Sequence, residues 1–285
     1  MSTQNPLSLT QKEAKWRRIE ASRSWSIPSF TEVWRVRGLI VMLLLRDFRL
    51  RYRQTILGIT WVVLQPVMLS LVYAVVFGLL ARLPSDNIPY LLFVYTGNVL
   101  WTIFPSASGR VSSSLLSNLS LISKVYFPRL ALPITNALGS LLDFLLMLPL
   151  LAAMLLLYHI PLTWHIILLP IFVFMMLLAG AGLGMIIASL GIRYRDAMQA
   201  LPIILQILTY ASPVSYSTSL IPPELLPFYQ LNPFVGIITG FRWAVLGIGE
   251  FSPLLSAYSI VFCVGIFLIG SILFRHAERS AVDVL

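Results

Sequence analysis

Charged side chains are scarce in this sequence. Only 11% of its 285 residues are Asp, Glu, Lys or Arg, whereas 58% are hydrophobic. An ordinary soluble domain carries roughly 25% charged residues. A soluble fold of this length could not cover so much apolar surface, so lipid must solvate part of it. The composition therefore predicts an integral membrane protein.

Cysteine, histidine and lysine are also rare, and their scarcity excludes several kinds of site. The single cysteine, Cys263, allows neither a disulfide within the chain nor a cysteine metal cluster. The three histidines are not spaced as metal ligands, and their positions suggest no Ser-His-Asp set. A phosphate-binding P-loop needs Gly-Lys followed by Ser or Thr, and none of Lys12, Lys15 and Lys124 follows a glycine. We therefore expect no catalytic residue, no metal site and no cofactor in this chain.

Long apolar stretches dominate what is present. At 1.5 Å per residue, even the shortest of six such stretches covers the hydrocarbon core of ~30 Å. We expect an all-α integral membrane protein with six transmembrane helices, forming a permease domain over 58–274. Because no internal repeat is visible, six spans indicate half of a transporter that a second subunit completes. The stretches are 58–80, 88–107, 130–157, 164–190, 197–216 and 253–274.

The residues before the first stretch divide into two parts. Residues 1–30 are polar and show no signal-peptide pattern, so we expect a cytoplasmic arm without a cleavable leader. Residues 31–57 predict an amphipathic helix in the membrane interface, because the short apolar run 39–45 is flanked by arginines. A solvated helix on a soluble partner is the alternative. The flanking arginines are Arg35, Arg37, Arg46, Arg49, Arg51 and Arg53.

The positive charges lie almost entirely on one side of the expected membrane. Of the 20 lysines and arginines, all but Arg82 and Arg242 fall before the first span, in the loops between spans two and three or four and five, or in the tail 275–285. The positive-inside rule places these segments, and both termini, in the cytoplasm. This bias explains the net charge of +9 without invoking nucleic acid.

Residues 212–253, between spans five and six, are broken by six prolines and four glycines. The apolar pieces 224–231 and 234–246 are too short to cross a bilayer and too apolar for a free loop. We expect two short re-entrant or gate helices on the outer side, buried against protein. Pro222 and Pro223 suit the first turn of one helix, and Asn232 with Pro233 suits the start of the other. A loop lying on the headgroups is the alternative.

The loop between spans two and three carries the strongest local pattern. Asn118 or Ser120 can cap a short helix, and Pro128 would end it. Such a helix would expose an apolar face that needs a partner, although it could instead rest on lipid headgroups. The residues of that face are Leu121, Ile122, Val125 and Phe127.

Together with three other motifs, this loop resembles a known family: the membrane subunit of ATP-driven bacterial polysaccharide exporters, the O-antigen, capsule and teichoic acid group of ABC permeases. The resemblance covers about residues 38–274, so the first thirty residues lie outside it. The motifs are Lys124-Val125-Tyr126-Phe127-Pro128-Arg129, Arg193-Tyr194-Arg195-Asp196, Asn232-Pro233-Phe234 followed by Phe241-Arg242-Trp243, and Arg46-Asp47-Phe48 leading to Tyr52-Arg53 and Gly58.

The resemblance implies a homodimer with two separate ATP-binding cassette subunits, which bind ATP and Mg, in a bacterial cytoplasmic membrane. It implies a polysaccharide cargo on a polyprenyl pyrophosphate, with O-antigen as the first candidate and capsule or teichoic acid as alternatives. The family's ATPase-coupling element maps onto Asn118, Leu121, Ile122, Lys124, Val125, Tyr126, Phe127 and Arg129. Its outer gate maps onto Phe228, Tyr229, Asn232, Phe234, Arg242 and Trp243.

Two further groups of side chains suit such a cargo. Arginine forks match phosphate oxygens, so Arg46, Arg49, Arg51, Arg53 and Arg110 are candidates for the lipid pyrophosphate, although membrane topology alone would also place arginine there. Aromatic faces complement sugar rings, although an interfacial aromatic belt is the simpler account. The candidates for a glycan path are Tyr73, Phe77, Tyr95, Trp101, Phe104, Tyr210 and Tyr216.

Asp143 is the one acidic residue well inside a predicted span. A carboxylate in lipid costs about 2.5 to 3.5 kcal/mol on insertion scales, so it must face protein, water or an arginine, or be protonated. A proton relay would suit an ion-coupled secondary transporter, and a structural hydrogen bond is the alternative. A secondary transporter would need several paired ionisable groups, and a membrane transferase would need acidic or histidine clusters at a membrane surface; the sequence shows neither.

Overall fold

The computed structural model describes residues 34–53, 56–118, 127–194, 196–249 and 251–283, and these residues form helices and connecting segments with no strand among them. The expected all-α class is confirmed. The helices are α2 (Arg37–Tyr52), α3 (Thr60–Tyr73) continued by the π-helix η1 (Ala74–Leu80), α4 (Tyr90–Ser117), α6 (Ala131–Leu157), the 3-10 helix η2 (Trp164–Leu168) leading into α7 (Leu169–Arg193), α8 (Asp196–Ala211), the 3-10 turn η3 (Thr218–Leu220), α9 (Leu226–Tyr229), α10 (Pro233–Leu246) and α11 (Pro253–Asp283).

Four of the helical segments are long and apolar enough to cross a membrane: Thr60–Leu80, Ala131–Leu157, Trp164–Arg193 and Pro253–Ala277. They coincide with the first, third, fourth and sixth expected spans. Helices α4 and α8 occupy the positions of the other two. Helix α8 has only 16 residues, and the buried polar side chains of α4 lower its hydropathy. The count of six spans therefore stays a prediction.

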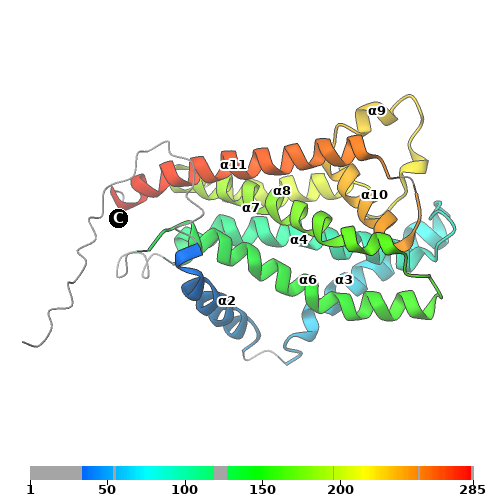
Figure 1. Ribbon diagram of the computed structural model, residues 1–285, viewed down its shortest axis with the longest axis horizontal. Helices are drawn as coiled ribbons and strands as arrows, with labels where there is room; N and C mark the ends of the chain where they lie inside the picture. The colour runs from blue at the N-terminus through cyan, green and yellow to red at the C-terminus, as the bar shows by residue number, and fades with distance from the viewer. Residues whose placement is uncertain (1–33, 54–55, 119–126, 195, 250, 284–285) are drawn as a thin grey trace, which may run out of the picture.

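The long helices run side by side, and their connections separate into two groups (Figure 1). Helix α2, the end of α4 and the start of α6, the end of α7 and the start of α8, and the end of α11 lie at one end of the bundle, whereas α9, α10 and the α6–α7 connection lie at the other. The first group borders the segments that are rich in arginine and lysine. Those parts of the expected cytoplasmic loops that the structure describes thus lie at one end.

Helix α7 forms the centre of the packing and contacts both α4 and α11. Small residues allow this close approach. A Cβ at Gly180 would lie 2.8 Å from the Phe104 carbonyl oxygen, and one at Gly184 would lie 2.8 Å from that of Ser108, both on α4. On its other side, a Cβ at Gly182 would lie 2.7 Å from the backbone of Ile266 on α11. Gly180 and Gly184, four residues apart, therefore let α7 pack closely against α4. Gly182, which lies between them in the sequence, lets α7 pack closely against α11.

The broken segment before α11 only partly follows the expectation. Helix α10 is buried and begins at Pro233, with the Asn232 side chain accepting a hydrogen bond from the Phe234 backbone N–H at 3.0 Å, as expected. The first piece is helical, but it differs from the expectation in length and burial, so its role as a gate helix stays a prediction. Helix α9 begins at Leu226, after Pro222 and Pro223, has four residues and leaves Phe228 72% exposed. A single helical turn has too few apolar side chains to bury.

We predict that Gly182→Ala lowers the thermal midpoint of the purified protein, because the added methyl group meets the α11 backbone, which cannot move aside as a side chain would. Overpacking of this kind costs about 1–3 kcal/mol. Gly265→Ala, on α11, is the matched control because nothing lies within 4 Å of its Cβ position. Equal midpoints for the two variants would contradict the backbone contact.

Candidate functional site

Helix α2 packs against α6 through its apolar side. Ile40 and Leu43 are buried in a small cluster with Phe127, Ala131 and Leu132 at the start of α6. Hydrophobic contacts therefore hold one face of α2 against the start of α6, while the other face of α2 carries arginines. The short apolar run expected to lie in the membrane interface is anchored on protein along this line.

Phe127 is 7% exposed in this cluster, so the expected exposed face is wrong at that residue. Asn118 is also buried, at 8%. The remaining predicted members of the face lie in 119–126, outside the described residues, so the face itself stays a prediction. The predicted ATPase contacts in that range are Leu121, Ile122, Lys124, Val125 and Tyr126.

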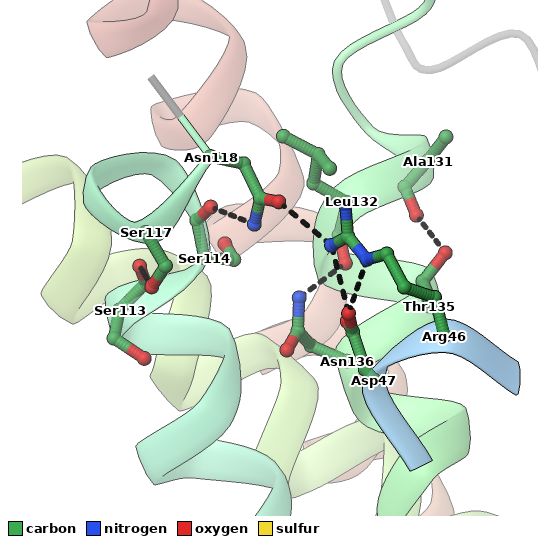
Figure 2. A network of polar contacts seen from close by, with 10 residues as sticks. All are labelled: Arg46, Asp47, Ser113, Ser114, Ser117, Asn118, Ala131, Leu132, Thr135 and Asn136. Atoms are coloured by element: carbon green, nitrogen blue, oxygen red, sulfur yellow. Dashed lines mark hydrogen bonds and ion pairs between the residues drawn. The ribbon is translucent and has the colours of Figure 1, made fainter. Parts of the chain in front are cut away.

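Polar side chains join α2 to the end of α4 (Figure 2). Arg46 on α2 donates from Nη2 to Asn118 Oδ1 at 3.1 Å, and Asn118 Nδ2 donates to the Ser114 carbonyl oxygen at 3.0 Å. Arg46 also pairs with its neighbour Asp47, at 2.7 Å. The last carbonyls of a helix lack partners within the helix and carry partial negative charge. Asn118 therefore satisfies one of these carbonyls, and Arg46 bonds the Asn118 side chain, at the point where α4 ends.

One turn further along α2, an ion-pair cluster joins three helices. Arg51 Nη1 on α2 lies 3.1 Å from Asp143 Oδ2 on α6, and Arg110 on α4 pairs with the same oxygen. The Tyr52 hydroxyl donates to Asp143 Oδ1 at 3.2 Å. The expectation that Asp143 faces an arginine or another protein group is confirmed. Its partners lie 92 and 33 positions away in the sequence, so no local pattern could identify them.

Arg51 and Arg110 of this cluster line a cleft between α2, α4 and α6. Thr135, Asn136 and Gly139 of α6 also line it, together with apolar side chains of α2 and α6. A Cβ at Gly139 would lie 2.6 Å from Arg110 Nη1, so a larger residue there would displace the end of the Arg110 side chain. These three residues were absent from the sequence-based candidates, because nothing in α6 alone marks them.

Of the five predicted pyrophosphate arginines, Arg51 and Arg110 meet at Asp143, and Arg46 lies one turn away at the end of α4. Arg49 and Arg53 are exposed on α2 and do not line the cleft. Three of the five arginines thus lie at contacts between helices, and the other two, Arg49 and Arg53, are exposed on the surface of the chain.

The predicted glycan-path aromatics do not form one surface. Tyr95, Trp101 and Phe104 are buried within the chain, where Trp101 Nε1 donates to Thr209 Oγ1 at 2.9 Å and the ring of Phe104 lies 4.6 Å from that of Phe234. Tyr73 and Phe77 form a half-buried pair with ring centroids 5.6 Å apart. Tyr210 is exposed, and Tyr216 shares a hydrogen bond of 2.9 Å with Tyr229.

At the opposite end of the bundle, Arg242 of α10 is buried and forms hydrogen bonds with the backbone of the turn after α8. It donates to the carbonyl oxygens of Pro213 at 2.7 Å and Val214 at 2.5 Å, and its guanidinium lies 3.7 Å from the Phe93 ring centre. Asn232 Nδ2 donates to the Ala211 carbonyl oxygen at 3.0 Å. The predicted gate residues Phe234 and Arg242 are therefore parts of a packed anchor, whereas Phe228 is exposed and Trp243 stacks on Phe251 at 4.8 Å.

The sequence of this chain is similar to those of known proteins. The family of ABC-2 type transporters matches residues 38–246, which run from α2 to the end of α10. The O-antigen export system permease protein RfbA of Myxococcus xanthus is 32% identical over 213 residues, which are 74% of this chain and 81% of the relative. A Klebsiella pneumoniae protein of the same name is 26% identical over 248 residues, 84% and 94% of the two chains. The polysialic acid transport protein KpsM of Escherichia coli is 25% identical over 253 residues, 84% and 93% of the two chains.

We predict that Arg46→Gln and Asn118→Ala each lower the thermal midpoint and that the double variant loses less than the sum of the two single losses. The two residues share one hydrogen bond, whose net contribution is about 0.5–1.5 kcal/mol. Arg49→Gln removes the same charge from an exposed position on the same helix and should leave the midpoint unchanged. Additive losses in the double variant would show that the two side chains do not act together.

Proposed function

Because the chain belongs to the ABC-2 type transporter family, we propose that it is the transmembrane subunit of an ATP-driven exporter that moves a lipid-linked polysaccharide across the cytoplasmic membrane. The observation that carries the proposal is the match with relatives named for O-antigen export and polysialic acid transport along 74% to 84% of this chain. The matched residues include the Arg46–Asn118 contact and the Asp143 cluster.

O-antigen is the first candidate cargo, because the relative with 32% identity is named for O-antigen export. Capsular polysaccharide is the second, since KpsM is named for polysialic acid, and teichoic acid remains an alternative. An ion-coupled secondary transporter has less support, because it would need several paired ionisable groups within the spans. Asp143, which pairs with Arg51 and Arg110, is the one acidic residue well inside a predicted span.

We propose six spans with both termini in the cytoplasm of a bacterial cell. Helix α4 has 28 residues, about 42 Å at 1.5 Å per residue, which exceeds the thickness of the hydrocarbon core. Its polar side chains face the other helices rather than lipid, which accounts for its lower hydropathy. Helix α8 is shorter, about 24 Å, so the turn that Arg242 holds would complete the crossing. The basic connections at one end of the bundle favour that end as cytoplasmic.

We propose that two copies of this chain work with two ATP-binding cassette subunits. The sequence has no P-loop of its own, so ATP and Mg would be bound by the partner. Residues 118–129 would dock on that partner at the basic end of the bundle. The buried Phe127 and the Asn118–Arg46 contact support this role indirectly, because they hold both ends of the segment on the helices it would have to move.

The five arginines would bind the pyrophosphate of the lipid carrier, and aromatic side chains would guide the glycan. For the glycan path, the half-exposed pair of Tyr73 and Phe77 and the exposed Tyr210 are better placed than the three core aromatics. The outer gate would consist of α10 with its Arg242 anchor, and the exposed α9 would be its mobile rim.

The first test is co-expression with the ATP-binding cassette subunit. We expect the two subunits to purify together, and we expect the lipid-linked glycan to stimulate ATP hydrolysis by the complex several-fold. Lipid without glycan is the control. If no polysaccharide of the host changes the rate of ATP hydrolysis by the complex, the proposed cargo class is wrong.

We predict that Val125→Asp releases the ATPase subunit, because a charge on the docking face opposes burial against the partner. Phe127 is left unchanged, since its burial against α2 means that a charge there would disturb the permease itself. Arg53→Gln is the control for altered charge near the same membrane surface. Co-purification that stays unchanged in Val125→Asp, with normal membrane insertion, would exclude this docking face.

A labelling experiment tests the outer gate. In a Cys263→Ser background, Ile238→Cys should react slowly with a membrane-impermeant thiol reagent and faster during transport, because Ile238 is fully buried in α10. Phe228→Cys should react rapidly in both states, since its side chain is 72% exposed. Rapid labelling of both cysteines in the resting protein would leave no gate at α10.

A further inference from the structure

Two guanidinium groups share one carboxylate in the Asp143 cluster. Arg51 comes from α2, Arg110 from α4 and Asp143 from α6, so the three charges sum to one excess positive charge. Among the residues the structure describes, no second carboxylate lies in ion-pair range of either arginine. Asp47 lines the same cleft, but its partner is Arg46 at 2.7 Å. The cluster is therefore left with an attraction for a further anion.

The guanidinium groups can be reached from the cleft. The Arg51 side chain is 40% exposed and that of Arg110 16%, whereas that of Asp143 is 11% exposed and lies behind them. Thr135 and Asn136 add polar groups to the same wall, although each also bonds a backbone carbonyl of α6. The missing side chain at Gly139 leaves Arg110 room to lie against α6.

The position of the cleft indicates which anion would enter it. Arg51 lies one residue before the end of α2, and α3, the first long apolar helix, begins at Thr60. The cleft therefore lies beside the junction between α2 and the first expected span, and it is bordered on the other side by the first half of α6. Phosphoryl groups are the anions that a bilayer presents at its surfaces, and arginine forks bind their oxygens in pairs.

We propose that Arg51 and Arg110 form a phosphoryl-binding site in which Asp143 is a built-in competitor. The carboxylate holds both guanidinium groups while the site is empty, and an entering phosphoryl group takes over these contacts. A phosphoryl group offers three oxygens and more negative charge than a carboxylate, so it can displace Asp143 without a change in fold. The competition lowers the affinity, which suits a ligand that must leave again.

This inference deepens the proposed function and rests on it only for the identity of the ligand, a lipid diphosphate. Its physical content is narrower, namely that the negative charge of Asp143 weakens phosphoryl binding. A purely structural ion pair makes the opposite prediction, because removing Asp143 would then loosen Arg51 and Arg110 and weaken any anion binding.

The test uses the permease in complex with its ATPase subunit, in nanodiscs of uncharged lipid, with farnesyl diphosphate as the probe and farnesol as the control ligand. Asp143→Asn keeps the size of the side chain and removes its charge. We expect it to bind farnesyl diphosphate about tenfold more tightly than the unaltered complex. Asp86→Asn is the matched control, because Asp86 bonds Ser217 and Ser219 at the opposite end of the bundle. Equal or weaker binding by Asp143→Asn overturns the proposal.

A second variant covers the case in which Asp143→Asn does not fold. Arg110→Lys keeps the charge and its attraction to Asp143 but loses the fork, so it should bind farnesyl diphosphate severalfold more weakly at an unchanged thermal midpoint. Unchanged binding by Arg110→Lys overturns the proposal. Competition of the probe with inorganic pyrophosphate, or with phosphatidylglycerol in the nanodisc, identifies the source of the phosphoryl group, and either competitor supports the site.

The two proposals fail separately. A complex that exports polysaccharide while Asp143→Asn leaves diphosphate binding unchanged would refute the competitor and keep the exporter. A complex in which Asp143→Asn strengthens diphosphate binding but no polysaccharide stimulates ATP hydrolysis would keep the site and refute the cargo.

Discussion

Hydrocarbon cannot form a hydrogen bond with a peptide group, and the architecture follows from that constraint. The long segments are helical, so their backbone groups are satisfied internally. Polar side chains inside the bundle follow the same rule: Thr96 and Ser108 on α4 each donate to the carbonyl four residues earlier, at 2.8 Å. Where the helices break, between α8 and α10, Arg242 and Asn232 bond the freed carbonyls. Irregular backbone occurs there because side chains from α10 and its cap supply the missing donors.

Helices whose backbone groups are hydrogen-bonded must still associate with one another. The hydrophobic effect contributes little to this association, because lipid tails are as apolar as leucine side chains. Close packing must hold the bundle together. The glycines of α7 serve this purpose by bringing its backbone against α4 and α11. At the basic end, α2 is held instead by a mixture of a small apolar cluster and charged contacts. Close packing of backbones thus holds the centre of the molecule together. At the basic end, α2 is held in part by charged side chains that can change partners.

This difference explains which features could be predicted from the sequence. Apolar length and charge distribution are local, so the helices, the cap at Asn232 and the gathering of basic loops at one end could be predicted. Asp143 could be expected to find a partner, but Arg51 and Arg110 could not be chosen, because the pairing depends on how three helices cross. The buried Phe127 was mistaken for an exposed residue because its partners, Ile40 and Leu43, come from α2, which lies far earlier in the sequence. The length and burial of the helix in 224–231 were overestimated, because apolar composition alone does not show whether a segment has neighbours to pack against.

The two ends of the bundle bury arginine in different ways, and the difference bears on function. Arg242 is held by backbone carbonyls and an aromatic ring, which belong to the fold and cannot leave without unfolding the turn after α8. Arg51 and Arg110 are held by one carboxylate, whose place a ligand oxygen can take while the helices stay where they are. An arginine bound to backbone fixes a structure, whereas an arginine bound to an exchangeable anion can report whether a ligand is present. In the proposed exporter, the exchangeable arginines would bind cargo at the entrance, and the fixed arginine would hold the backbone around the exit.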